Sequence, residues 1–207
     1  MVPILGTWDK VEEIDFTQLP NEFILKWNHG SGNEFYSIIN DKTNIQCELD
    51  KLRKVSKTNF AVCGCEYQYE LIKPKIIAEK LLKGNNKILN DYKVLCFNGI
   101  PKYILVCTER NNGRDYFDFE WNYMPFVKKE YRSKNSIEKP QGLDKMYKYA
   151  SIISKGFNYA RVDFYDIDGK IYFGEITLTP SGCCHHNLTK EAQIKLGNLI
   201  ELPRREE

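Results

Sequence analysis

Apolar residues along the chain occur mostly in short runs that alternate with polar residues, a pattern typical of β-strands. By this criterion we expect strands at residues 23–27, 35–39, 76–82, 92–97, 103–107, 161–165 and 171–176. Two pairs of these segments flank strong turn signals, Asn98-Gly99 in the first pair and Asp166-Ile167-Asp168-Gly169 in the second. Such turns are typical of two-stranded hairpins, so the pattern predicts antiparallel pairing.

Helical spacing of apolar residues is found in fewer places. It is clearest after Gly142, where apolar residues recur every three or four positions and predict an amphipathic helix at 142–154. Further helices are expected at 45–55 and at 189–202, the latter capped by Thr189, and a short helix is expected at 7–14. Antiparallel hairpins with helices between them indicate an α+β fold.

Charge and composition exclude several classes of protein. The 207 residues include 30 Lys+Arg and 28 Asp+Glu, and the sequence pI is about 8.1, below the value of about 9 that is typical of nucleic-acid-binding domains. No apolar run approaches the roughly 18 residues of a membrane span, and the first residues lack the pattern of a secretory signal. We therefore expect a cytoplasmic protein without nucleic-acid partners.

The seven cysteines fit a reducing compartment in which thiols stay free. Cys183-Cys184-His185-His186 offers four soft metal ligands in a row, and Cys63 and Cys65 flank a glycine. Structural zinc sites usually space paired ligands two to four residues apart, whereas consecutive residues point in different directions. We expect scattered thiols rather than zinc, with a zinc site as the alternative.

The glycine-rich segment Gly30-Ser31-Gly32 follows a predicted strand that carries Lys26. Small residues let backbone N–H groups approach phosphate oxygens, and a lysine adds a positive charge. This arrangement suits a phosphate-binding loop, although an ordinary hairpin turn would have the same composition.

Four residues of the last predicted hairpin bear on metal chemistry. Residues i and i+2 of a strand face the same side, so Arg161 and Asp163 point together, as do Glu175 and Thr177. If the two strands pair, the two carboxylates converge beside the arginine. This set suits magnesium-bridged phosphates, and the alternative is one solvated face of a sheet.

The order of these segments resembles that of the ATP-grasp enzymes, and most closely the TupA-like ATP-grasp family associated with bacterial surface polysaccharide and teichuronopeptide gene clusters. The resemblance covers roughly residues 3–182 and rests on four motifs in sequence, FILKWNHGSG, PKIIAEKLL, NDYKVLCFNGIPKYI and ARVDFYDIDGKIYFGEITLTPSG. It implies two α+β lobes, at residues 1–82 and 83–207, whose antiparallel sheets hold a nucleotide between them.

The resemblance also implies a role for each matching residue. On the nucleotide side, Lys26 matches the phosphate lysine, and the loop Gly30, Ser31 and Gly32 matches the mobile loop over the triphosphate. Glu79 and the backbone of Lys80 and Leu82 match the groups that hold adenine. Asp91, with Lys93 beside it, matches the contact on the ribose side. Asp163, Glu175 and Thr177 match the magnesium ligands, and Arg161 matches the arginine that contacts the transferred phosphate.

The chain departs from the family pattern in two places. Thr177 replaces the asparagine that many ATP-grasp enzymes carry at the second metal strand. Family members also have a preceding segment with an Asp-Lys pair, which this chain lacks, so we expect either another group in place of that lysine or a truncated form.

The resemblance implies an ATP- and magnesium-dependent carboxylate-amine ligase of cell-surface polysaccharide biosynthesis, acting through an acyl phosphate on small-molecule or glycan substrates. Arg110 and Arg114 could meet a substrate carboxylate, or could be exposed arginines of a polar loop. One alternative function is a catalytically inactive nucleotide-binding protein. Another is a glycosyltransferase, for which Asp166 and Asp168 have the Asp-x-Asp spacing but lie in a predicted hairpin tip.

Overall fold

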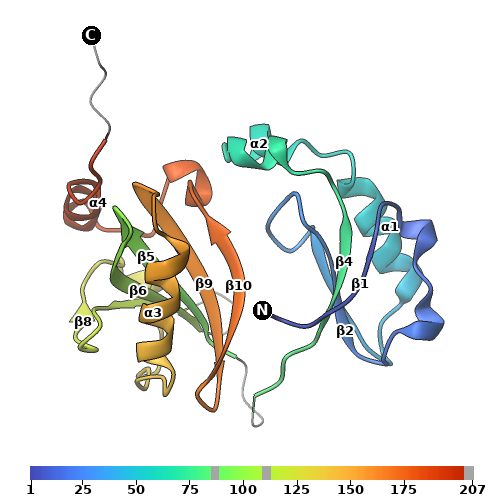
Figure 1. Ribbon diagram of the computed structural model, residues 1–207, viewed down its shortest axis with the longest axis horizontal. Helices are drawn as coiled ribbons and strands as arrows, with labels where there is room; N and C mark the ends of the chain where they lie inside the picture. Colours follow the sequence, from blue (N-terminus) through green and yellow to red (C-terminus); the bar gives the residue numbers. More distant parts are fainter. Residues whose placement is uncertain (85–88, 109–112, 203–207) are drawn as a thin grey trace. The chain divides into compact units, whose positions relative to one another are not determined.

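The computed structural model describes residues 1–84, 89–108 and 113–202 (Figure 1). The chain divides into two compact units. One unit comprises Val2–Leu82, and the other comprises Met1 together with Lys83–Glu207.

Among its described residues, the Val2–Leu82 unit contains a four-stranded antiparallel sheet in the order β1-β4-β2-β3. The strands are β1 (Ile4–Trp8), β2 (Phe23–Trp27), β3 (Tyr36–Ile39) and β4 (Ile76–Lys80). The helices are α1 (Ile45–Val55) and α2 (Phe60–Cys63), with 3₁₀ turns η1 (Val11–Glu13), η2 (Phe16–Gln18) and η3 (Tyr67–Leu71).

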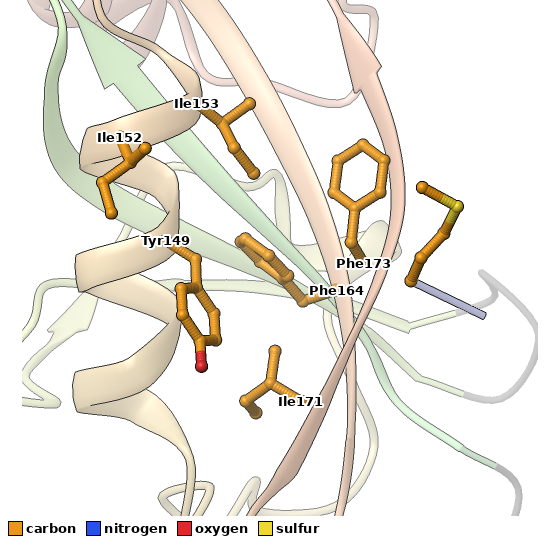
Figure 2. A pocket seen from close by; sticks show the side chains of 7 residues that line it. Tyr149, Ile152, Ile153, Phe164, Ile171 and Phe173 are labelled. Atoms are coloured by element: carbon orange, nitrogen blue, oxygen red, sulfur yellow. The ribbon is translucent and has the colours of Figure 1, made fainter. Parts of the chain in front are cut away.

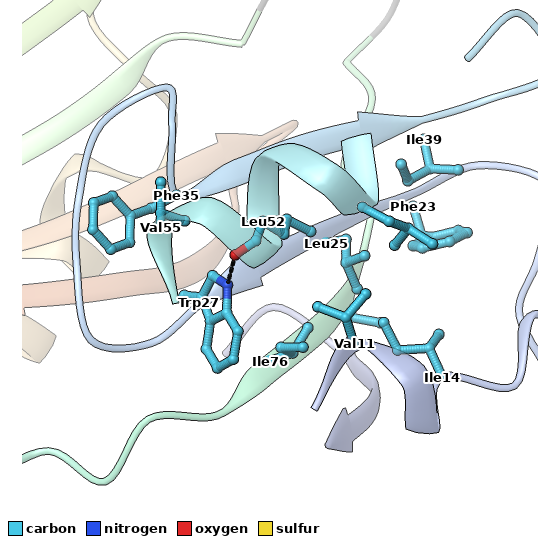
Figure 3. Close-up of a cluster of buried hydrophobic side chains, with 12 residues drawn as sticks. Val11, Ile14, Phe23, Leu25, Trp27, Phe35, Ile39, Leu52, Val55 and Ile76 are labelled. Atoms are coloured by element: carbon cyan, nitrogen blue, oxygen red, sulfur yellow. Dashed lines mark hydrogen bonds between the residues drawn. The ribbon is translucent and has the colours of Figure 1, made fainter. Parts of the chain in front are cut away.

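Helix α1 covers one face of this sheet. The side chain of Asn44 caps the helix by accepting a hydrogen bond from the Cys47 N–H, and the apolar face of α1 packs on the inward residues of β2 and β4. The indole Nε1–H of Trp27 donates to the carbonyl oxygen of Leu52 at 3.0 Å, which fixes strand to helix (Figure 3). Because strand side chains alternate, Lys26 and Glu79 lie on the opposite face of the sheet.

The second unit contains a six-stranded antiparallel sheet in the order β10-β9-β5-β6-β7-β8, within the described residues. The strands are β5 (Asp91–Phe97), β6 (Ile100–Thr108), β7 (Gly113–Phe117), β8 (Tyr123–Met124), β9 (Tyr159–Ile167) and β10 (Lys170–Thr177). The helices are α3 (Leu143–Ile153) and α4 (Lys190–Gly197), with 3₁₀ turns η5 (Lys129–Tyr131) and η6 (Pro180–Cys183).

Apolar side chains pack on both faces of the six-stranded sheet, but on one face they cover only part of the surface. Helix α3 packs its buried residues against the inward side chains of β5, β6 and β9. On the other face, α4 and the segment around Phe126 and Leu188 pack over Leu95, Phe97 and their neighbours. The rest of this second face carries the charged residues described below.

The structure confirms the α+β architecture, with helices 45–55 and 142–154 and both hairpins close to their expected positions. The helix predicted at 7–14 is wrong, because Thr7 and Trp8 pair with Ile77 and Ile76 in β1 and only a 3₁₀ turn follows. Thr189 caps α4 as expected, but the helix ends at Gly197. In the described parts of the chain, no helix is long and apolar enough to cross a membrane.

Candidate functional site

The guanidinium of Arg161 gathers the predicted metal-binding residues around itself. Its Nε and Nη2 donate to the two carboxylate oxygens of Asp163, each at 2.8 Å. The same Nη2 donates to Glu175 Oε1 at 2.9 Å and to Thr177 Oγ1 at 3.0 Å. The structure therefore brings together all four residues that the last hairpin was predicted to contribute.

A β-bulge in β10 makes this convergence possible. Phe173 lies opposite Phe164, but Ile176 already lies opposite Val162, so β10 has one more residue than β9 in this interval. Phe173 consequently packs on the α3 side, whereas Glu175, two residues later, reaches Arg161 on the other face. Such a bulge re-aims a side chain, and bulges are frequent beside active sites.

Lys93 lies at the buried centre of a charged cluster, which comprises Asp91, Lys93, Arg161, Asp163, Glu175 and Thr177. It lies directly opposite Asp163, and its Nζ is 2.5 Å from Asp163 Oδ2 and 2.6 Å from Asp91 Oδ2. The side chains of Lys93 and Asp163 are only 13% and 4% exposed. Lys93 therefore links the predicted ribose-side residue Asp91 to the predicted metal ligand Asp163.

Burial and neighbouring charges set the pKa values in the cluster. Burial raises the pKa of a carboxyl group, but Lys93 and Arg161 outweigh this at Asp163 and hold its pKa below the usual value. At Asp91 burial dominates and the pKa is raised; its Oδ1 is buried without a hydrogen-bond partner among the described residues. Burial and the charge of Asp163 also raise the pKa of Glu175.

The donor set of the cluster suits magnesium. Asp163, Glu175 and Thr177 offer hard oxygen atoms, and Glu175 is 43% exposed, so one side of its carboxylate faces solvent. Among residues 1–84, 89–108 and 113–202, no group of three or more His, Cys, Asp or Glu could by itself hold a metal ion. Two carboxylates still fit magnesium, which is commonly held by one or two carboxylates together with substrate phosphates and water.

In the Val2–Leu82 unit, Lys26 and Glu79 form an ion pair with Lys26 Nζ 2.8 Å from Glu79 Oε2. They lie on adjacent strands β2 and β4, and their side chains are 31% and 13% exposed. The structure thus pairs the predicted phosphate lysine with the predicted adenine glutamate.

The predicted phosphate loop connects β2 to β3. A Cβ atom on Gly30 would lie 2.1 Å from the ring of Phe35, so only glycine fits there. Gly32 has φ +96°, a conformation that favours glycine, and nothing lies within 4 Å of where its Cβ would be. Ser31 between them is exposed.

Lys80 ends β4, and its backbone N–H donates to the carbonyl of Pro3 at 2.9 Å. In a hydrogen bond between the Lys80 backbone and a base, the Lys80 carbonyl oxygen would therefore have to be the acceptor. Leu82 follows the strand and is half-buried.

A left-handed turn follows β10. Ser181, Gly182 and Cys183 have φ values of +55°, +57° and +62°, which are unusual for consecutive residues. Cys183 and Cys184 are exposed free thiols.

We expect the purified protein to carry no stoichiometric zinc, and the double change Cys183→Ser with Cys184→Ser to leave ATP binding intact. Consecutive residues seldom meet one ion at zinc-ligand distances of about 2.0–2.3 Å. Metal analysis after dialysis and calorimetry with ATP check both points. One equivalent of zinc, lost in the double variant together with folding, would contradict the expectation.

A separate apolar cavity of about 300 Å³ lies between α3 and the β9–β10 hairpin (Figure 2). Its lining includes Tyr149, Ile153, Phe164, Ile171 and Phe173. Phe164 and Phe173 belong to the core beside α3, so the cavity lies on the side of the sheet opposite the charged cluster.

Two features of the site were not predicted from the sequence pattern. The Asp91-x-Lys93 and Arg161-x-Asp163 spacings each place two charges on one strand face, which could have suggested that the four meet. Arg114 lies on strand β7 and is half-buried rather than exposed in a loop, whereas Arg110 lies outside the described residues.

Comparison with solved structures shows a shared fold. The D-alanine–D-alanine ligase from Bacillus anthracis complexed with ATP is 19% identical, with a TM-score of 0.55, and the match covers 94% of this chain and 56% of the ligase. The D-alanine–D-alanine ligase from Helicobacter pylori is 15% identical, with a TM-score of 0.50 and coverage of 97% and 57%. The chain shares the fold of these two ligases and spans a little over half of their length.

The family follows from the sequence itself. The family model for TupA-like ATP-grasp proteins matches residues 1–201, so the chain belongs to the TupA-like ATP-grasp family, as its motifs indicated. A search of curated proteins found none that matches the chain.

Proposed function

We propose that the protein is an ATP- and magnesium-dependent ligase that joins a carboxylate to an amine. The observation that carries the proposal is the convergence of Asp163, Glu175 and Thr177 on the guanidinium of Arg161. Family membership and the likeness to two D-alanine–D-alanine ligases, one of them complexed with ATP, support it.

In the proposed reaction a substrate carboxylate oxygen attacks the γ-phosphorus of ATP, the bond to ADP breaks, and an acyl phosphate forms. The amine nitrogen then attacks the acyl carbon, phosphate leaves, and the amine gives up a proton to form the amide. Arg161 stabilises the charge on the moving phosphoryl group, and Lys26 binds the phosphates. Magnesium, held by Asp163 and Glu175 with Thr177, would offset the charge of the triphosphate.

The family's association with surface polysaccharide gene clusters supports a role in polysaccharide assembly, and we place that role in the cytoplasm, where ATP and free thiols are found. The test is ADP release from ATP and magnesium in the presence of amino acids or uronic acids. Hydroxylamine, added in place of the amine, should convert the acyl phosphate to a hydroxamate. ATP binding without either product would instead support an inactive nucleotide-binding protein.

Replacing Lys26 by alanine should weaken ATP binding by about 1.5–3 kcal/mol, the range for a hydrogen bond to a charged group. Calorimetry with ATP and magnesium measures the change. Lys54→Ala removes an exposed lysine of α1 in the same unit and should leave the affinity unchanged. Undiminished affinity in Lys26→Ala would rule out the phosphate role of this lysine.

A further inference from the structure

Arg114 belongs to the charged face of the six-stranded sheet. It lies opposite Cys107 on β6, and Cys107 lies opposite Asp91 on β5. Residues directly opposite one another share a face, so these three form one row across β5, β6 and β7. Two residues along β7, Tyr116 packs into the apolar core of this same face.

The positive charge of Arg114 is not neutralised within the described parts of the chain. Lys93 and Arg161 are each paired with carboxylates, whereas Arg114 makes no ion pair or hydrogen bond there. Its Cα lies two strand spacings, about 9.6 Å, from that of Asp91, with Cys107 between them. Burial raises the pKa of Cys107 to about 11, so this neighbour stays an uncharged thiol.

The loop after β10, which contains His185, packs on the same face of the sheet. An isolated bridge between Val127 and Leu188 and a hydrogen bond from the Lys128 N–H to the Asn187 carbonyl hold the loop on this face of the sheet. His185 is half-buried, and its pKa is lowered by burial and by the charges of Arg161 and Arg114. His185 is therefore a neutral polar group within electrostatic reach of both arginines.

We propose that Arg114 binds a non-reacting carboxylate of the substrate. The inference rests on the proposed ligase function and specifies its substrate class: one of the two substrates carries a carboxylate besides the reacting group. That substrate is either a dicarboxylic acid that is phosphorylated at its other end or an amino acid that supplies the amine. A guanidinium binds either carboxylate through two parallel hydrogen bonds.

The position of Arg114 in the sheet favours substrate over ATP. Within this unit, the residues proposed to act on the phosphates lie on β9 and β10, and β7 is three strand spacings, about 14 Å, from β9. The guanidinium of Arg161 therefore contacts the reacting group, and Arg114 holds a group further along the same face.

The first test is the Nε–Hε NMR signal of Arg114 in the full chain, assigned by its loss in Arg114→Lys. Succinate and glycine should shift this signal, and glycinamide, which has no carboxylate, should not. This measurement needs no turnover, so it decides the inference even if no ADP is released and the ligase proposal fails.

The second test is steady-state ADP release with Arg114→Met. The KM for the carboxylate-bearing substrate should rise about 10- to 100-fold, as expected for loss of a charge-assisted contact, and the KM for ATP should not change. Whether the KM of the acid or of the amine rises distinguishes the two sources of the carboxylate. The KM should rise less in Arg114→Lys, because lysine keeps the positive charge.

Arg53→Met is the matched control, since it removes an arginine of the other unit that already pairs with Glu12 and Asp50. An Arg114 signal that no carboxylate shifts would overturn the inference. So would a rise in the KM for ATP alone, or a lower melting temperature with unchanged KM values.

Discussion

Replacing Glu175 by glutamine is expected to slow phosphoryl transfer by about 100- to 1000-fold, the range for loss of one preorganised electrostatic contact at a reacting centre. The amide keeps the shape of the carboxylate and can still accept the hydrogen bond from Arg161. It loses the negative charge that a bound magnesium ion needs. ADP release in the presence of the carboxylate substrate measures the effect.

Glu175 is a cleaner probe than Asp163 because it is 43% exposed, so its neutralisation should leave the melting temperature nearly unchanged. Glu120→Gln, at an exposed position of the same unit, is the matched control and should keep full activity. Asp163→Asn gives an independent check of the metal assignment. Turnover of Glu175→Gln within a few-fold of the wild type would mean that Asp163 and Glu175 stabilise the fold and do not bind magnesium.

Replacing Lys93 by methionine should destabilise the second unit by about 3–5 kcal/mol, the usual cost of removing one partner from a buried ion pair. The change leaves Asp91 and Asp163 facing each other without the ammonium group that now lies between them. Hydrogen exchange of the backbone amides of β5 and β9 measures the loss in the unit concerned.

Lys102→Met is the control, because Lys102 is an exposed lysine of the neighbouring strand β6, and a change of within about 0.5 kcal/mol is expected. The loss in Lys93→Met should also shrink as the pH falls from 7 to 5. With Lys93 gone, repulsion and burial raise the pKa of a carboxyl above its unfolded value, so the folded state takes up a proton at acid pH and regains stability. Equal stability of both variants would show that the cluster is solvated in solution.

Local sequence patterns were sufficient to predict the hairpins and the convergence of Arg161, Asp163 and Glu175. Strong turns at Asn98-Gly99 and Asp168-Gly169 fix the pairing of neighbouring strands, and alternation then assigns faces. Alternation alone, however, would place Phe173 on the same face as Glu175. The bulge that separates them adds one residue between Phe173 and Ile176, and Gly174 inside the strand is the one sequence signal that could have indicated it.

Contacts between distant segments could not be read in the same way. Lys93 and Asp163 are 70 residues apart, and their pairing depends on the register between β5 and β9, which no turn sets. The same holds for β1, whose pairing with β4 overrides the helix-like start at Thr7. Pairing between strands that are distant in the sequence determines both contacts, and local propensity does not report on such pairing.

The bulge in β10 affects more than the direction of the Glu175 side chain. Within its sheet, β10 is an edge strand, and a regular edge offers a row of N–H and C=O groups to which a strand of another molecule can add. The extra residue interrupts that row and twists the strand locally. A chain lacking Gly174 would therefore pair regularly, with Glu175 opposite Asp163 and still on the face of Arg161, but its flatter edge would be more open to a strand of another molecule.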